Sequence, residues 1–231
     1  MKKLLMIFLA VSVLMSMNMS VYASERIYDD VSPNAWYSKT IEIATEAGMV
    51  SGVGNNLFKP NDFVTREQAA MILYKRLGNG KVYNNYHFND VKAGTWYADA
   101  IEWMYRSGFT YGVSDSNYGV GEFITRQDLM TLIYRINQEE WETLWDDDQA
   151  KYAGRFDINI YQFDDYKEVS DYAFKAMNFA TGLNTIYFQH VSISVTPILW
   201  GDNHNKLNPV DNCTRAEAVA IIQRSWDRII Y

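Results

Sequence analysis

The chain has 231 residues, 48% hydrophobic and 15% aromatic, and it carries 21 basic and 28 acidic residues for a formal net charge of −7. A chain of this length and aromatic content can bury a sizeable core, which excludes an intrinsically disordered protein. The negative charge argues against nucleic acid or an anionic membrane as the principal partner, so any anion must be bound locally.

The first residues, 1–23, have the features of a secretory signal peptide. Two lysines at positions 2 and 3 precede an apolar run over residues 4–15, and Ala23 ends a stretch suited to signal peptidase. We expect cleavage after Ala23, which leaves 19 basic and 28 acidic residues and a net charge near −9. The run is too short for a comfortable bilayer span, so we expect secretion without a transmembrane anchor. A retained, uncleaved anchor is the alternative.

An internal repeat organises the rest of the chain. A shift of 60 residues lays matching residues on one another without a gap, among them Asp30 on Asp90, Trp36 on Trp96, Gly52 on Gly112, Thr65 on Thr125 and Arg66 on Arg126. A looser third copy opens at Phe163 and has Tyr172 in the tryptophan position. We predict repeats over 27–79, 87–138 and 163–226, a spacer over 139–162, and an insertion at about 184–201 in the third repeat.

Each copy is predicted to form a helix, a loop and a second helix. The second helices begin at Thr65, Thr125 and Thr214, where residues three positions on can complete a capping box. Their apolar stripes end at Leu77, Ile136 and Trp226, and three such stripes can bury one another. We therefore predict an all-α fold, a pseudo-threefold bundle, with a short hairpin or strand over residues 187–198 in the insertion.

An arginine follows each of these threonines, namely Arg66, Arg126 and Arg215. A cation is mildly disfavoured in the first turn of a helix, where the backbone N–H groups are already positive. An anion bound between the guanidinium and the helix end would make the placement favourable. The alternative is an inter-repeat salt bridge, for example to the aspartates that open each copy, Asp30, Asp90 and Asp165. For these aspartates we expect capping of the following turn.

No group of residues in the sequence calls for catalysis, a metal or a cofactor. Cys213 is the only cysteine, and since it takes the position of Val64 and Ile124 we expect a buried, inert thiol. His87, His190 and His204 lack the spacing of a zinc site. The acidic run at 146–148 lacks the alternating spacing of a calcium loop, and residues 201–205 are interpreted as a turn. We expect no enzyme activity.

The recurring motifs are FxDV, then Trp or Tyr, then Gly, then FxP, then TRAE, in three copies of 50 to 60 residues. This pattern resembles the S-layer homology (SLH) domain triplet and covers nearly the whole mature chain. The resemblance implies a three-pronged, all-helical pseudo-trimer. It also implies non-covalent attachment to secondary cell-wall polysaccharide, typically through sugars that carry a pyruvate ketal.

The same resemblance implies a set of ligand-binding residues. Arg66, Arg126 and Arg215 match the ligand-contacting arginine of the motif, while Trp36, Trp96 and, after a gapped alignment, Tyr172 match the aromatic position. Gly52 and Gly112 would let the backbone approach the ligand, and Lys59 lies in the loop ahead of the motif. Exposed aromatic faces would stack on sugar rings, although core packing is the alternative for the two tryptophans.

The copies depart from the pattern in ways that predict unequal grooves. The second has Tyr118-Gly119-Val120 in place of FxP, which is expected to loosen its loop, and the third lacks the tryptophan. We therefore rank the first groove as most competent, the second next and the third last. On this basis Arg66→Ala should weaken wall binding more than Arg215→Ala and leave the fold intact.

Three functions from different classes follow from these observations. The first is a secreted, non-catalytic anchor at the bacterial cell wall or surface layer that binds secondary cell-wall polysaccharide and possesses no cofactor. The second is a surface-layer or envelope assembly subunit that acts by contacts with other surface proteins without binding glycan. The third is a small hydrolase of wall glycan, which would need an acid and a base flanking a cleft.

Overall fold

The computed structural model describes residues 27–78, 80–143, 160–182, 184–188, 191–195 and 197–227. The predicted signal peptide, the acidic run at 146–148 and His190 lie outside the described residues.

Helices dominate the described residues. They are α2 (Ser38–Glu46), α3 (Arg66–Leu77), α4 (Ala98–Arg106), α5 (Arg126–Thr143), α6 (Asp171–Thr181) and α7 (Arg215–Asp227), with two short 3-10 turns, η1 (Ile160–Gln162) and η2 (Tyr166–Glu168). The strands β1 (Asn184–Phe188) and β2 (Val191–Val195) form an antiparallel hairpin inside the predicted insertion. The predicted all-α class is confirmed.

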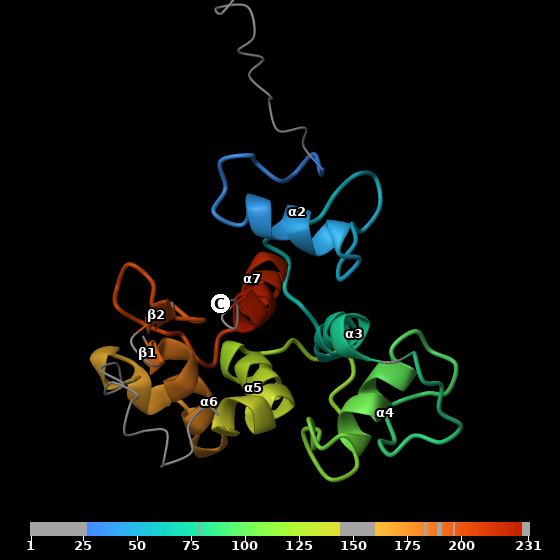
Figure 1. Ribbon diagram of the computed structural model, residues 1–231. Helices are drawn as coiled ribbons and strands as arrows, with labels where there is room; N and C mark the ends of the chain where they lie inside the picture. The colour runs from blue at the N-terminus through green and yellow to red at the C-terminus, as the bar shows by residue number, and fades with distance from the viewer. Residues whose placement is uncertain are drawn as a thin grey trace, which may run out of the picture.

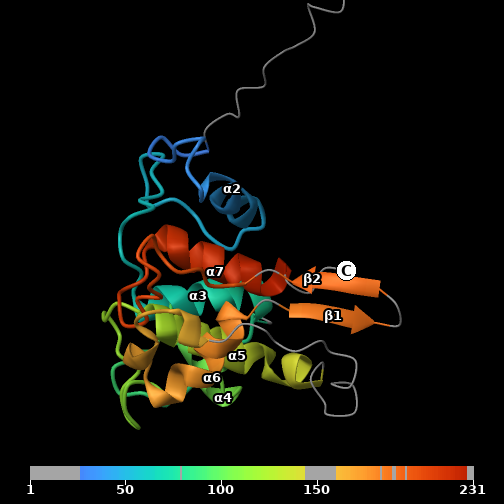
Figure 2. The same cartoon turned by 90° about the vertical axis from the view of Figure 1, so that its left-hand side faces the viewer.

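The three helices that follow the Thr-Arg motifs lie together at the centre, and the other three lie outside them (Figure 1). Each outer helix packs on the central helix of the preceding copy: α4 on α3, α6 on α5, and α2 on α7. A second view shows the hairpin extending from one end of the bundle (Figure 2). The helices that pack on each other therefore belong to different copies. The first described helix, α2, packs on the last one, α7.

The central helices bury the apolar stripes that their spacing predicts. Buried members are Ala69, Ile72 and Leu73 of α3, Leu129, Leu132 and Ile133 of α5, and Ala218, Ile221 and Ile222 of α7. The last residue of each predicted stripe is less buried, since Leu77 is exposed and Ile136 and Trp226 are only partly buried. In each helix the buried stripe thus lies three to seven residues after the arginine.

A ring of backbone hydrogen bonds joins the three copies just ahead of the central helices. The amide of Ile124 donates to the carbonyl of Val64, that of Cys213 donates to Ile124, and that of Val64 donates to Cys213, each over 2.9 Å. All three residues are fully buried. Burial raises the pKa of the Cys213 thiol to about 12, which agrees with the predicted inert thiol.

Candidate functional site

The aspartate that opens each copy fixes the loop that precedes the next helix of that copy. Asp30 accepts from the backbone N–H groups of Phe58 and Lys59 at 2.8 and 2.7 Å, and Asp90 from those of Tyr118, Gly119 and Val120 at 2.8, 2.8 and 2.9 Å, which lie 28 to 30 residues further on. In the third copy, which has the insertion, Asp165 accepts from the N–H groups of Leu207 and Asn208 at 2.9 and 2.7 Å, 42 and 43 residues further on. Within the described residues, these aspartates form no ion pair with the motif arginines. The sequence predicted that these aspartates cap the following turn, with ion pairs to the motif arginines as the alternative. In the structure their carboxylates instead hold loops that lie 28 or more residues further along the chain.

The residue held by each aspartate has a left-handed backbone. Lys59 has φ of 58°, Gly119 of 89° and Asn208 of 51°. Glycine fits Gly119 for a second reason, because a Cβ atom there would lie 3.0 Å from Cδ of Arg66. The departure of the second copy from FxP therefore does not loosen the loop, since Tyr118 is fully buried and hydrogen-bonded.

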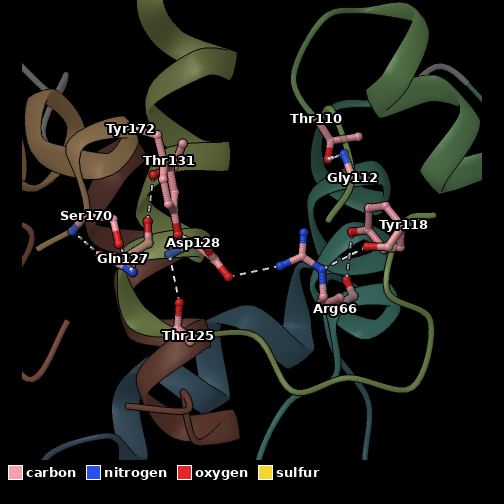
Figure 3. Close-up of polar contacts among 10 residues, drawn as sticks. All are labelled: Arg66, Thr110, Gly112, Tyr118, Thr125, Gln127, Asp128, Thr131, Ser170 and Tyr172. Atoms are coloured by element: carbon pink, nitrogen blue, oxygen red, sulfur yellow. Dashed lines mark hydrogen bonds and ion pairs between the residues drawn. The ribbon is translucent and has the colours of Figure 1, made fainter. Parts of the chain in front are cut away.

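Each motif arginine crosses to the loop of the next copy. Nε of Arg66 donates to the carbonyl of Tyr118 at 3.0 Å, Nε of Arg126 to Leu207 at 2.8 Å, and Nε of Arg215 to Phe58 at 2.8 Å. The hydroxyl of Tyr118 donates back to the carbonyl of Arg66 at 3.0 Å (Figure 3). The three arginines therefore join neighbouring copies.

Two of the arginines also form ion pairs across the copies. Nη1 of Arg66 lies 3.0 Å from Asp128, and Nη1 of Arg126 lies 3.0 Å from Glu217 (Figure 3 shows the first pair). Only 8% of the Arg66 side chain is exposed. The alternative of inter-repeat salt bridges therefore holds for these two, but the partners are the acidic residues of the next capping motif.

The third arginine lacks such a partner because the corresponding position is Gln68. Arg215 instead donates from Nη2 to the carbonyl of Ser51 at 3.0 Å, and its guanidinium lies 4.6 Å from the ring centre of Phe58. Burial lowers the pKa of Arg215, and nearby Asp62 partly opposes this shift. The three positions therefore differ in charge: two hold neutralised pairs and one holds a cation without a carboxylate within 4.0 Å among the described residues.

The aromatic residues at the predicted stacking positions lie on the surface. Trp36, Trp96 and Tyr172 are 59%, 57% and 55% exposed, so core packing is not their role. The hydroxyl of Tyr172 donates to Asp128 (Figure 3), and burial, together with this hydrogen bond, raises the pKa of Tyr172 to about 12. Tyr172 thus stays neutral and contacts the same carboxylate that holds Arg66.

The two predicted glycines are close to internal rings. A Cβ atom on Gly52 would lie 2.7 Å from Tyr28, and one on Gly112 would lie 2.6 Å from Phe88. A Cβ atom on Gly201 would likewise lie 2.7 Å from the ring of Phe163, and the repeat pattern did not indicate this third glycine. Lys59 is exposed, and its Nζ lies 3.5 Å from Asp62.

The grooves around Arg66 and Arg126 each contain residues of all three copies. Around Arg66 of the first copy lie Tyr118 and Asp128 of the second and, through Asp128, Tyr172 of the third (Figure 3). The corresponding surface around Arg126 is a cleft of about 480 Å³ whose lining includes Trp36, Glu217 and residues 199–203 and 208. In the part of the chain that the structure describes, neither of these two grooves is formed within a single copy.

Two cleft residues, Trp200 and Arg224, were missed in the sequence analysis. A sequence pattern could have revealed Arg224, because an arginine also stands nine residues after Arg126, at Arg135. Trp200 belongs to the predicted insertion of the third copy and has no such pattern.

Within the described ranges, no group of three or more His, Cys, Asp and Glu side chains could hold a metal ion. None of the helices in that part of the chain is long and apolar enough to cross a membrane. In the turn at 201–205, the carboxylate of Asp202 accepts hydrogen bonds from the backbone of His204 and Lys206. This agrees with its interpretation as a turn.

The fold and grooves define a class of protein: a predominantly helical repeat protein whose candidate binding surfaces form where copies meet. Two segments, residues 27–70 and 87–130, match the family model of the S-layer homology domain. The resemblance is confirmed for these two segments, which run from the residue before Tyr28 and Phe88 into α3 and α5. The assignment of residues 163–226 as a third repeat stays a prediction.

Several known proteins are similar to this chain. An amylopullulanase of Thermoanaerobacterium thermosulfurigenes is 31% identical over 204 residues, which cover 88% of this chain and 10% of the relative. An exoglucanase XynX of Acetivibrio thermocellus is 29% identical over 195 residues, 84% of this chain and 16% of the relative. A cellulosome-anchoring protein of Acetivibrio thermocellus is 30% identical over 94 residues, 39% of this chain and 21% of the relative. The chain thus matches about a fifth or less of the length of each.

Proposed function

We propose that this chain anchors non-covalently at the bacterial cell surface by binding secondary cell-wall polysaccharide, without catalysis. The S-layer homology matches and the similarity to a cellulosome-anchoring protein support a cell-wall anchoring role and a cell-surface location. The observation that carries the proposal is the composite groove, in which an arginine, a fixed loop and an exposed aromatic ring come from different copies.

This arrangement suits a sugar that bears a carboxylate, such as a pyruvate ketal. An exposed aromatic face can stack on the apolar side of a sugar ring, while a guanidinium can bind a carboxylate through two parallel hydrogen bonds. The proposed contacts are Trp36, Trp96 and Tyr172, the arginines Arg66, Arg126 and Arg215, and the loop residues Gly52, Gly112 and Lys59.

The contacts have unequal support in the geometry. Arg215 has no carboxylate neighbour within 4.0 Å among the described residues, so no ion pair at that distance would compete with a bound anion. Arg66 and Arg126 are already paired with Asp128 and Glu217, so a bound anion would share each guanidinium with that carboxylate. The rings of Tyr28 and Phe88 fill the space beside the two glycines, which therefore would act through the shape of the loop.

A second candidate function is assembly with other surface proteins. Phe63 and Phe123 precede the backbone ring, are each 48% exposed, and have ring centres 5.4 Å apart. Exposed aromatic side chains are enriched at protein interfaces. This pair favours a protein contact at the end of the bundle where the central helices begin.

Sedimentation with purified wall fragments separates the two functions. We expect the secreted chain to sediment with intact fragments and to remain in solution when their polysaccharide has been removed chemically. Removal of the ketal alone should weaken binding, because the anionic group would be lost.

Retention on stripped peptidoglycan would contradict the anchoring proposal and favour a protein or peptidoglycan partner. Phe63→Ser serves as the matched variant, since it alters the exposed pair and leaves the grooves unchanged. Loss of wall binding in that variant would also favour the second function.

A further inference from the structure

The cleft around Arg126, lined by α7 and by residues 199–203 and 208, has two aromatic walls. Trp36 precedes α2 of the first copy and is 59% exposed, whereas Trp200 lies in the third copy and is 54% exposed. Both line the cleft of about 480 Å³, a volume within the range of small-ligand sites. A cleft with two exposed indole rings suits a ligand with alternating apolar faces and polar edges, as in a saccharide.

Four charged side chains line the same cleft, and three of them already have partners. Arg126 is paired with Glu217 at 3.0 Å. Asp202 accepts hydrogen bonds from the side chain of Asn208 and the backbone N–H groups of Lys206 and His204, and these lower the pKa of Asp202 to about 2. Both acidic groups of the cleft are therefore occupied by donors of the chain itself.

The fourth, Arg224, has no such partner. It is half-buried, and no carboxylate lies within 4.0 Å of it in the part of the chain that the structure describes. Its guanidinium lies 5.8 Å from the ring centre of Trp36, and Nη1 makes a long contact of 3.5 Å with the carbonyl of Ile198. Burial lowers the pKa of Arg224, and Arg126 lowers it further. A desolvated cation without a counter-ion favours the arrival of an anion.

We propose that this cleft binds an acidic saccharide, that Arg224 contacts its carboxylate, and that Trp36 and Trp200 contact its rings. The proposal rests on the proposed glycan-binding function. It assigns the anion to Arg224, which lies nine positions after the motif arginine Arg215. Arg126 then positions the loop through the carbonyl of Leu207 and its pair with Glu217. The sequence pattern ranked the groove of the third copy last. This cleft, which contains the loop of that copy, would nevertheless be a competent site.

Calorimetric titration with two small glycosides tests this assignment. The first probe is a methyl hexosaminide with a 4,6-linked pyruvate ketal, and the second is the same compound with its carboxylate as a methyl ester. We expect Arg224→Gln to weaken binding of the acid by about tenfold or more and to change binding of the ester little, because only the acid has the charge. Trp200→Ala should weaken binding of both.

Matched variants separate charge from folding. Arg76→Gln removes one exposed positive charge from the last turn of α3 and should leave both affinities unchanged. Arg224→Lys keeps the charge and should bind the acid better than Arg224→Gln does. Thermal unfolding of each variant verifies that the folded chain is titrated.

Equal binding of the acid by Arg224→Gln and the natural chain would overturn the assignment of Arg224. If the chain binds wall polysaccharide but neither glycoside, the proposed function stands and the acidic-saccharide cleft does not. If it binds neither polysaccharide nor glycosides, both proposals fall.

Discussion

Replacing Arg66 with alanine is expected to lower the free energy of unfolding by about 3–5 kcal/mol, the range for removing one partner of a buried ion pair. The change leaves Asp128 without its cation and removes the donor to the carbonyl of Tyr118. Urea unfolding followed by circular dichroism measures the effect. This expectation differs from that of the sequence analysis, in which Arg66→Ala left the fold intact.

A double-mutant cycle identifies the cause of this loss. Arg66→Ala combined with Asp128→Ala should destabilise the chain by less than the sum of the single changes, because the second change removes the stranded carboxylate. Arg76→Ala is the control, since that residue is exposed on the same helix. Additive single effects would show that the two side chains are not coupled and would contradict the inter-repeat role.

The loss has a consequence for binding measurements. Weak wall binding by Arg66→Ala would reflect unfolding as well as loss of a ligand contact, so that variant cannot by itself identify a binding residue. Arg215 is only partly buried and has no carboxylate partner among the described residues. We therefore expect Arg215→Gln to be the cleaner test of a motif arginine as a glycan contact.

Asp90→Ala is expected to lower the free energy of unfolding by on the order of 3 kcal/mol, because three backbone donors lose an ionised acceptor. Two of those donors, Tyr118 and Gly119, lie beside Arg66, so the loop that receives the arginine should become mobile. Hydrogen exchange of the amides at 118–120 measures this directly. Asp115→Ala, an exposed aspartate of the same loop, should leave both quantities unchanged.

The same aspartate predicts part of the acid sensitivity of the chain. Burial acts to raise the pKa of Asp90, but hydrogen bonds from Val120, Tyr118 and Gly119 outweigh it and hold the pKa of this carboxyl below its ordinary value. A group with a lowered folded-state pKa stabilises the protein above its unfolded pKa and loses that contribution as pH falls through the folded value. Asp90→Ala should therefore lose less stability than the natural chain as pH falls below about 4. Equal losses in the two chains would contradict this role.

Local features were predictable because they depend on neighbouring residues. The helices after Thr65, Thr125 and Thr214 follow from capping residues and apolar spacing, and all three are present. Even so, the caps differ in detail. Glu217 reaches back to both the amide and the hydroxyl of Thr214, whereas the shorter Asp128 turns its carboxylate to Arg66.

The composition of each groove was not predictable from the repeat pattern. Repeats suggest that an arginine, an aromatic residue and a loop of one copy act together, but each outer helix packs on the central helix of the preceding copy. That packing brings Trp36 of the first copy against residues of the third. Only this arrangement shows that Arg224 and Trp200 line a cleft together with Trp36.

The sequence by itself determined the repeated helices, the all-α class and the resemblance to the S-layer homology domain, since periodicity and capping are local properties of the chain. The tertiary structure alone decided what each arginine contacts. Arg66 and Tyr118 are 52 residues apart and Arg126 and Glu217 are 91 apart, and spacing carries no information on such pairs. A guanidinium binds whichever carbonyl or carboxylate the packing brings within about 3 Å of it.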